Sequence, residues 1–201
     1  EVNGSQNPAE AAVIYDVENR WAVEDAAGPR NAGVFYKETV EKPYQAFRKL
    51  GINVDVIDET CSLDGYRVVA APMVYLLREG WTEKVRNFVK NGGIFLLTYW
   101  SGIVDETDLC YLGGTPHDLM DVMGFRSMEI DGLYDGEWNE GIPEPENPLH
   151  LELAYRCSHL CELVQPSTAE VVMTYGKDFY DGMPAMTRNV YGKGKAYAVC
   201  A

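Results

Sequence analysis

The sequence predicts an α/β fold with a mostly parallel β-sheet, helices on both of its faces and an antiparallel hairpin at the C-terminal end. Two patterns predict it. Short apolar runs alternate with amphipathic segments over the first 125 residues, and two apolar runs near the C-terminus flank a Gly-Lys-Gly turn. The 201 residues, 46% of them hydrophobic and 24% charged, suffice for one domain with a substantial core.

The first elements follow from periodicity. Residues 11–16 (AAVIYD) are a short apolar run that suits a buried parallel strand. The next segment predicts a helix, because its apolar residues recur at spacings of three and four and it ends at Gly51, a C-capping residue type. These apolar residues are Tyr36, Val40, Tyr44, Phe47 and Leu50. Pro43 lies inside this segment, so the helix either begins near Pro43 or kinks there.

Two strands are predicted next, at 53–58 and 66–72. The link between them, residues 59–65, is too short for a helical crossover. It must therefore be a loop that either carries the chain over the sheet edge or reverses it.

The second half of the parallel pattern begins with a helix face and continues with a buried strand at 93–99. A capped helix is predicted from Thr115 to Gly124. Residues 132–150, rich in Gly, Pro and acids, predict an irregular excursion. A strand at 169–175 and a hairpin around Gly192–Gly194 complete a flavodoxin-like α/β domain. The helix predicted before the 93–99 strand has its apolar face formed by Trp81, Val85, Phe88 and Val89.

Composition excludes several classes of protein. The chain has 17 basic and 31 acidic residues, a net charge of −14, which disfavours nucleic acid or an anionic membrane as a partner. It has no run of 18 apolar residues and no signal-type segment. The five cysteines, an odd number scattered along the chain, indicate free thiols in a reducing compartment, so we expect a cytoplasmic protein.

The two ends predict a fragment. Residues 1–10 (EVNGSQNPAE) are polar and resemble a linker or tag remnant, and residues 11–201 are expected to form the domain. The chain stops inside an apolar, strand-like run, KAYAVCA, which is unusual for a natural terminus. We therefore expect a piece of a longer protein.

Nucleotide-binding motifs are absent from the sequence. The first strand is followed by DVENRW instead of a G-x-G-x-x-G turn, and there is no P-loop. The glycine pairs Gly113–Gly114 and Gly192–Gly194 are interpreted as turns. No cofactor is expected.

Nucleophilic catalysis would need a reactive residue at the turn after the 93–99 strand, where enzymes with this element order place a cysteine. The turn here is Thr98-Tyr99-Trp100-Ser101-Gly102, and the nucleophile position holds Trp100. Ser101 could act only with a nearby base. No histidine follows in a His-x-Glu pattern, so we predict a degenerate turn without catalytic residues; the three histidines are His117, His150 and His159.

Three further groups could carry chemistry. Cys157, His159 and Cys161 would share one strand face and could bind zinc, but no second ligand pair exists, and buried thiols are the favoured interpretation. Three acidic residues follow in a loop, namely Asp105, Glu106 and Asp108. They could bind a cation or a sugar, but such a cluster is more typical of a solvent-exposed turn. The tryptophans could stack on a sugar, although core or interface positions are commoner; they are Trp21, Trp81, Trp100 and Trp138.

Seven segments, taken together and in this order, resemble one known family. They are IYDVENRWA (14–22), GPRN (28–31), GINVDVID (51–58), VVAAPMVYL (68–76), FVKNGGIFLLTYWSGIVDETD (88–108), LGGTPHDLMDVMG (112–124) and NVYGKGKAYAV (189–199). The family is the middle, trimerisation domain of the family 42 glycoside hydrolases, which are β-galactosidases. The resemblance implies a class I glutamine-amidotransferase-like fold without its catalytic cysteine.

The resemblance also implies a function. The chain would be a non-catalytic oligomerisation domain of a homotrimeric, retaining β-galactosidase, whose two catalytic glutamates lie in an N-terminal TIM barrel outside this chain. Its partners would be its own copies and that barrel. Two alternatives stay open: a stand-alone amidotransferase-like hydrolase acting from the 98–108 loop, and a carbohydrate-binding module using exposed tryptophans.

Overall fold

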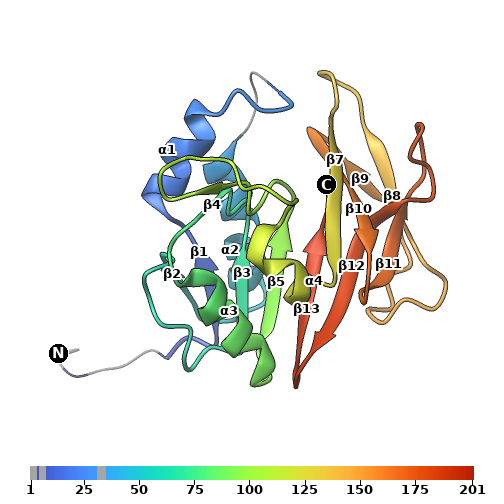
Figure 1. The fold of residues 1–201 in the computed structure, drawn as a ribbon. Coiled ribbons are helices and arrows are strands. Elements are labelled where there is room, and N and C mark those ends of the chain that lie inside the picture. The colour runs from blue at the N-terminus through green and yellow to red at the C-terminus, as the bar shows by residue number, and fades with distance from the viewer. Residues whose placement is uncertain (1–3, 5–7, 31–34) are drawn as a thin grey trace.

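Figure 1 shows the fold in a computed structural model, which describes residue 4 and residues 8–30 and 35–201. Most of the predicted linker, residues 1–3 and 5–7, lies outside the described residues. The helical elements are α1 (Val17–Asp25), α2 (Tyr36–Lys49), α3 (Trp81–Lys90), the 3-10 turn η1 (His117–Leu119) and α4 (Met120–Met123). The strands are β1 (Ala11–Ile14), β2 (Val54–Ile57), β3 (Val68–Ala71), β4 (Leu76–Leu77), β5 (Ile94–Thr98), β6 (Val104–Asp105), β7 (Phe125–Gly132), β8 (Asn139–Pro143), β9 (Tyr155–Cys157), β10 (Leu160–Pro166), β11 (Glu170–Tyr175), β12 (Pro184–Tyr191) and β13 (Gly194–Val199).

One nine-stranded sheet organises the molecule, with the strand order β2-β1-β3-β5-β13-β12-β11-β8-β9. The strands from β2 to β13 pair in parallel, whereas those from β13 to β9 pair antiparallel. The sheet is therefore mixed, and the prediction of a mostly parallel sheet was wrong. β13 joins the two halves because it pairs in parallel with β5 and forms the predicted hairpin with β12.

Helices cover both faces of the parallel half, as predicted. Successive side chains of a strand point to opposite faces. Ala12 and Ile14 of β1 therefore pack with α3 and α4, whereas Val13 packs with α1 and α2. Figure 1 shows α3 and α4 in front of the sheet and α2 behind it. We call these two sides the α3 side and the α2 side.

The link between β2 and β3 carries the chain across the sheet. Both strands lie parallel to β1, on opposite sides of it, so the link does not reverse the chain. Leu63 in this link is buried in the core cluster on the α3 side. The loop therefore crosses over β1 on that side and does not reverse the chain, which excludes the predicted reversal.

Local periodicity missed or misplaced several elements. α1 was not predicted, and α2 begins at Tyr36, well before Pro43, which lies inside the helix. The predicted 132–150 excursion contains β8 and the end of β7, so it is not wholly irregular. β7 and β10 form a separate antiparallel ribbon that packs on the α3 side of β12.

No helix in the described part of the chain is both long and apolar enough to cross a membrane.

Candidate functional site

The carboxyl ends of β1, β3 and β5 meet at one edge of the sheet, the edge at which α/β proteins bind their ligands. The turn after β5 has Trp100 at φ 57°, in the left-handed region that an ordinary side chain avoids. The nucleophile turns of hydrolases have this strained geometry. The turn after β5 thus shares the left-handed residue of such turns, with an indole at the position where the sequence comparison would place a nucleophile.

The indole of Trp100 fills the space at this turn. It is 3% exposed, and its ring packs edge-on against Tyr75 with the centroids 5.0 Å apart. A β-carbon added at Gly28 would clash with the Trp100 ring, so the loop before α2 packs directly on the indole. No room is left at this position for a substrate.

Ser101, the conceivable hydroxyl nucleophile, has no base. Its Oγ donates a hydrogen bond to the Thr98 carbonyl at 2.8 Å and is buried. His117 instead stacks on Tyr111 with centroids 3.6 Å apart, and His159 lies edge-on to Phe35. Among the described residues no histidine is hydrogen-bonded to Ser101. The geometry offers no support for the alternative of a hydrolase acting from this loop.

A buried carboxyl group lies behind the turn. Glu162 of β10 is 4% exposed, and its Oε2 accepts a hydrogen bond from the Trp100 backbone N–H at 3.1 Å. Burial raises the pKa of Glu162 to about 7, and hydrogen bonds from Ser127 and Trp100 only partly oppose this. No motif predicted a role for Glu162, although an acid within the apolar run LCELV was a signal.

A second polar cluster fastens α1 to the sheet edge. Asp16 is 1% exposed and caps α1 by accepting hydrogen bonds from the backbone N–H groups of Glu18 and Asn19. Its other oxygen binds the Arg78 guanidinium, with Nε and Oδ2 2.7 Å apart. The buried side chain of Asn19 bonds the Met73 carbonyl and the Leu76 N–H. This cluster is saturated by its own contacts and therefore holds the fold together.

Glu59 is the other buried carboxyl group at this edge. One oxygen accepts the Arg78 backbone N–H at 2.9 Å, and the other is buried without a hydrogen-bond partner. Burial raises the pKa of Glu59 to about 8. Lys84 donates to the carbonyl oxygens of Glu59, Thr60 and Cys61 rather than to the carboxyl group.

The proposed zinc group does not share one strand face. Cys157 lies in β9 and Cys161 in β10, and His159 between them has φ 74° at the chain reversal. Burial raises the pKa of both thiols, that of Cys157 to about 11. Over residues 8–30 and 35–201, no three His, Cys, Asp or Glu residues are placed to hold a metal ion. All five cysteines are free; Cys157, Cys161 and Cys200 are buried, whereas Cys110 is exposed and Cys61 partly so.

The acidic loop is a hydrogen-bonded turn. Asp105 Oδ1 accepts hydrogen bonds from the backbone and hydroxyl of Thr107 at 2.8 and 2.7 Å, and these hold the pKa of Asp105 below its usual value. Asp108 occupies the left-handed position of the turn, with φ 63°. These contacts stabilise the turn itself, as expected for a structural acidic loop.

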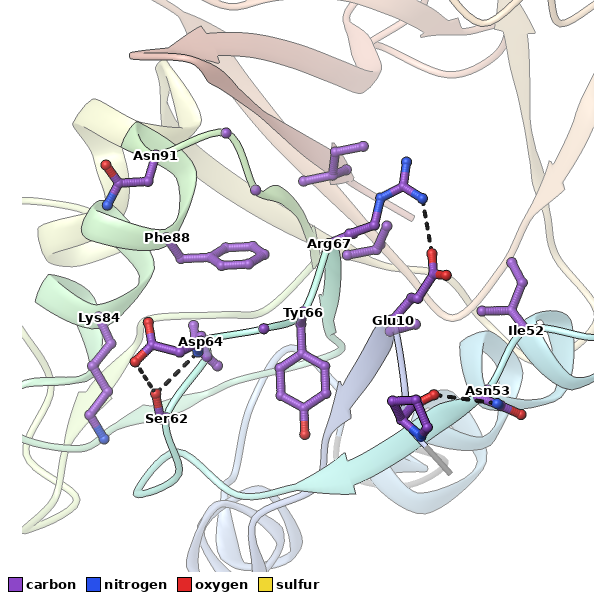
Figure 2. Close-up of a pocket in the computed structure, with 18 of the residues that line it drawn as sticks. Glu10, Ile52, Asn53, Ser62, Asp64, Tyr66, Arg67, Lys84, Phe88 and Asn91 are labelled. Carbon is purple, nitrogen blue, oxygen red and sulfur yellow. Dashed lines mark hydrogen bonds and ion pairs between the residues drawn. The ribbon is translucent and has the colours of Figure 1, made fainter. Parts of the chain in front are cut away.

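A large cavity lies at the opposite edge, where the parallel strands begin. It is an open groove of about 1070 Å³ (Figure 2). Its charged groups bind one another or the backbone: Arg67 pairs with Glu10 at 2.9 Å, Asp64 accepts from Ser62, and Lys84 is held by three carbonyls. A groove whose charges are already satisfied offers little to a charged ligand.

The fold and the filled turn define a class of protein: an α/β domain whose strained turn after β5 is filled by a buried tryptophan. Comparison with known families then names it. The family model described as the β-galactosidase trimerisation domain matches residues 9–201, and the chain belongs to this family.

Its relatives are β-galactosidases. The chain is 51% identical to β-galactosidase BglY of Alicyclobacillus acidocaldarius over 98% of its own length and 29% of that protein. It is 47% identical to β-galactosidase Pbg of Clostridium perfringens over 99% of its length, again 29% of the relative. The crystal structure of a β-galactosidase from Rahnella sp. R3 matches with a TM-score of 0.97 and 50% identity, over 99% of this chain and 29% of that one. The chain thus spans less than a third of these relatives.

Proposed function

We propose that this chain is the non-catalytic trimerisation domain of a larger, retaining β-galactosidase. One observation carries the proposal: the family match covers residues 9–201, while the same chain spans only 29% of its β-galactosidase relatives. Hydrolysis of terminal β-galactosides would then be the work of two carboxylates in a TIM barrel outside this chain. The Trp100 turn, which lacks both a nucleophile and space, supports a non-catalytic role. Neither the hydrolase nor the carbohydrate-binding alternative gains support from these observations.

The proposal extends to the origin of the fold, the bounds of the domain and the location in the cell. The order β2-β1-β3-β5-β13 is that of flavodoxin-like sheets, and the strained turn after β5 supports an amidotransferase-like origin for this half. We infer that residues 11–201 act as one domain, since β1 and β13 belong to one sheet, and that 1–10 is a linker. The unpaired cysteines support a cytoplasmic location.

Self-association of the 201-residue chain tests the assembly role. We expect sedimentation velocity to show a concentration-dependent shift from one copy toward three, with weak affinity, because a net charge of −14 opposes the approach of like copies. Salt should favour association, since screening shortens the range of this repulsion to about 8–10 Å at physiological ionic strength. A constant monomer mass at millimolar protein and high salt would contradict the proposed function.

The chain alone should not hydrolyse nitrophenyl-β-galactoside. The physical reason is that the filled turn lacks a nucleophile–base pair and that Asp105 is committed to a hydrogen-bonded turn. Turnover above the buffer rate that survives repurification and disappears in Asp105→Ala or Glu106→Ala would contradict a non-catalytic role.

A further inference from the structure

The antiparallel half of the sheet has one side without a covering layer in the part of the chain that the structure describes. Ala196 and Ala198 of β13, with Thr187 of β12, are buried on the α3 side, beneath α3, α4 and the β7–β10 ribbon. Since strand side chains alternate, their neighbours point to the α2 side. Yet α2 packs on β1 and β2, at the far end of the sheet. We call the α2 side of β8, β9, β11, β12 and β13 the outer face.

Side chains of the outer face are exposed or half-buried and partly apolar. In β12 and β13 they lie in register, with Arg188 opposite Tyr197 and Val190 opposite Lys195. Val190 is 61% exposed, and Ile142 of β8 is 42% exposed. Val190 and Tyr197 are diagonal neighbours, because Arg188 lies opposite Tyr197, whereas Ile142 lies toward the other end of β12, opposite Thr174. An exposed valine beside a half-buried tyrosine on a sheet surface is typical of a protein–protein contact.

The outer face reverses the charge balance of the chain. Its strands carry three cations, Arg156, Arg188 and Lys195, against two carboxylates, Glu140 and Glu170, both of which are opposite or bonded to a cation. Lys177 adds a fourth cation at its border, 3.7 Å from Glu140. The whole chain, in contrast, has 31 acidic against 17 basic residues. The face is therefore a locally cationic surface on a strongly acidic molecule.

An aromatic anchor stands at the border of the face. Trp138 precedes β8 and is 40% exposed. Lys177 Nζ lies 3.0 Å from the centroid of its ring, and the Arg156 guanidinium lies 5.7 Å away. Cation–π contacts hold the indole in one place, so that a partner would meet a pre-ordered tryptophan, the residue type that contributes most to interface affinity.

These features decide between the two ways in which copies can meet. In an isologous contact two outer faces would oppose each other and bring cations against cations. In a heterologous contact the cationic face would meet the acidic remainder of the next copy. This attraction acts at the contact itself, whereas the repulsion that salt screens acts over longer range between whole copies of net charge −14. Heterologous contacts that close on themselves form rings such as trimers.

We propose that the outer face is the surface through which one copy of this chain binds the acidic surface of the next copy around the threefold axis. The inference rests on the proposed function and names the surface that performs it.

A pair of matched double variants tests this proposal in the 201-residue chain. Val190→Glu with Lys195→Glu places two carboxylates on the outer face. Val56→Glu with Lys49→Glu makes the same change of charge at two exposed sites near the other end of the sheet, on β2 and α2. Sedimentation velocity should show the outer-face variant with a dissociation constant at least about tenfold higher than that of the wild type, and the control within about twofold. Circular dichroism checks that both variants are folded.

The outcomes separate the two proposals. A wild-type trimer that both variants weaken equally, or that the outer-face variant leaves intact, would overturn this inference and assign the face to another domain of the longer protein, with the proposed function unharmed. A wild-type chain that never associates would contradict the proposed function itself. If the outer-face double variant does not fold, the single change Lys195→Glu, compared with Lys49→Glu, should shift association in the same direction by a smaller factor.

Discussion

Replacing Trp100 with alanine should lower the free energy of unfolding by about 3–5 kcal/mol, the usual cost of removing a large buried aromatic side chain. The indole is 3% exposed and supports both Tyr75 and the loop at Gly28, so its loss leaves a cavity between three segments. Chemical denaturation monitored by circular dichroism measures the change. Trp21→Ala is the control, because Trp21 is 59% exposed and should cost no more than about 1 kcal/mol.

A second variant at the same position separates the cavity from the backbone strain. At φ 57°, glycine avoids the steric penalty that alanine pays in the left-handed region, roughly 1 kcal/mol. We therefore expect Trp100→Gly to be more stable than Trp100→Ala, the reverse of the order found at ordinary positions. If alanine proves the more stable, the turn does not hold the left-handed conformation on which its comparison with a nucleophile turn depends.

Glu162→Gln should make the protein more stable than the wild type at pH 8.5, with an advantage that shrinks toward pH 5. The pKa of Glu162 is about 7 in the folded protein, above the ordinary value of 4.5, because the carboxyl group is buried. The folded protein therefore retains a proton that the unfolded chain releases between these two values. As pH rises through this window the wild type loses up to about 1.4 kcal/mol per pH unit, roughly 3 kcal/mol in all.

Glutamine carries no charge to bury, so the variant escapes that loss. Its amide oxygen can still accept the Trp100 N–H, which keeps the turn in place. Denaturant unfolding at pH 5, 6, 7 and 8.5 gives the difference in unfolding free energy between the two proteins. Glu152→Gln, at an exposed position, should differ from the wild type by the same amount at each pH. A flat difference for Glu162→Gln would mean that Glu162 is ionised without penalty and that its surroundings are more polar than the structure indicates.

The elements that sequence predicted well share one physical property. The strands at 11–16, 53–58, 66–72 and 93–99 all occur within a few residues of their expected positions, because parallel strands under helices need short continuous apolar runs. The empty nucleophile position at Trp100 was also visible, since a motif depends on residue identity at one turn.

The missed elements depend on partners far along the chain. α1 has little amphipathic pattern, but Asp16 caps it, and Asn19 binds Met73 and Leu76, 54 and 57 residues away. β8 and the end of β7 lie in a stretch that is rich in breaks and acids, and pairing with β11, β9 and β10 makes them strands. No local window contains those partners.

By itself the sequence determined the alternation that builds the parallel half, the tryptophan at the turn after β5 and the membership of the β-galactosidase trimerisation family. Only the tertiary structure decided that β13 enters the sheet between β5 and β12, which makes half of the sheet antiparallel and leaves the outer face open. It also decided that Glu59 and Glu162 are buried carboxyl groups with a raised pKa. The reason is the same in both cases: periodicity reports which side of an element is apolar, whereas strand neighbours and the burial of one carboxyl group are set by contacts between distant segments.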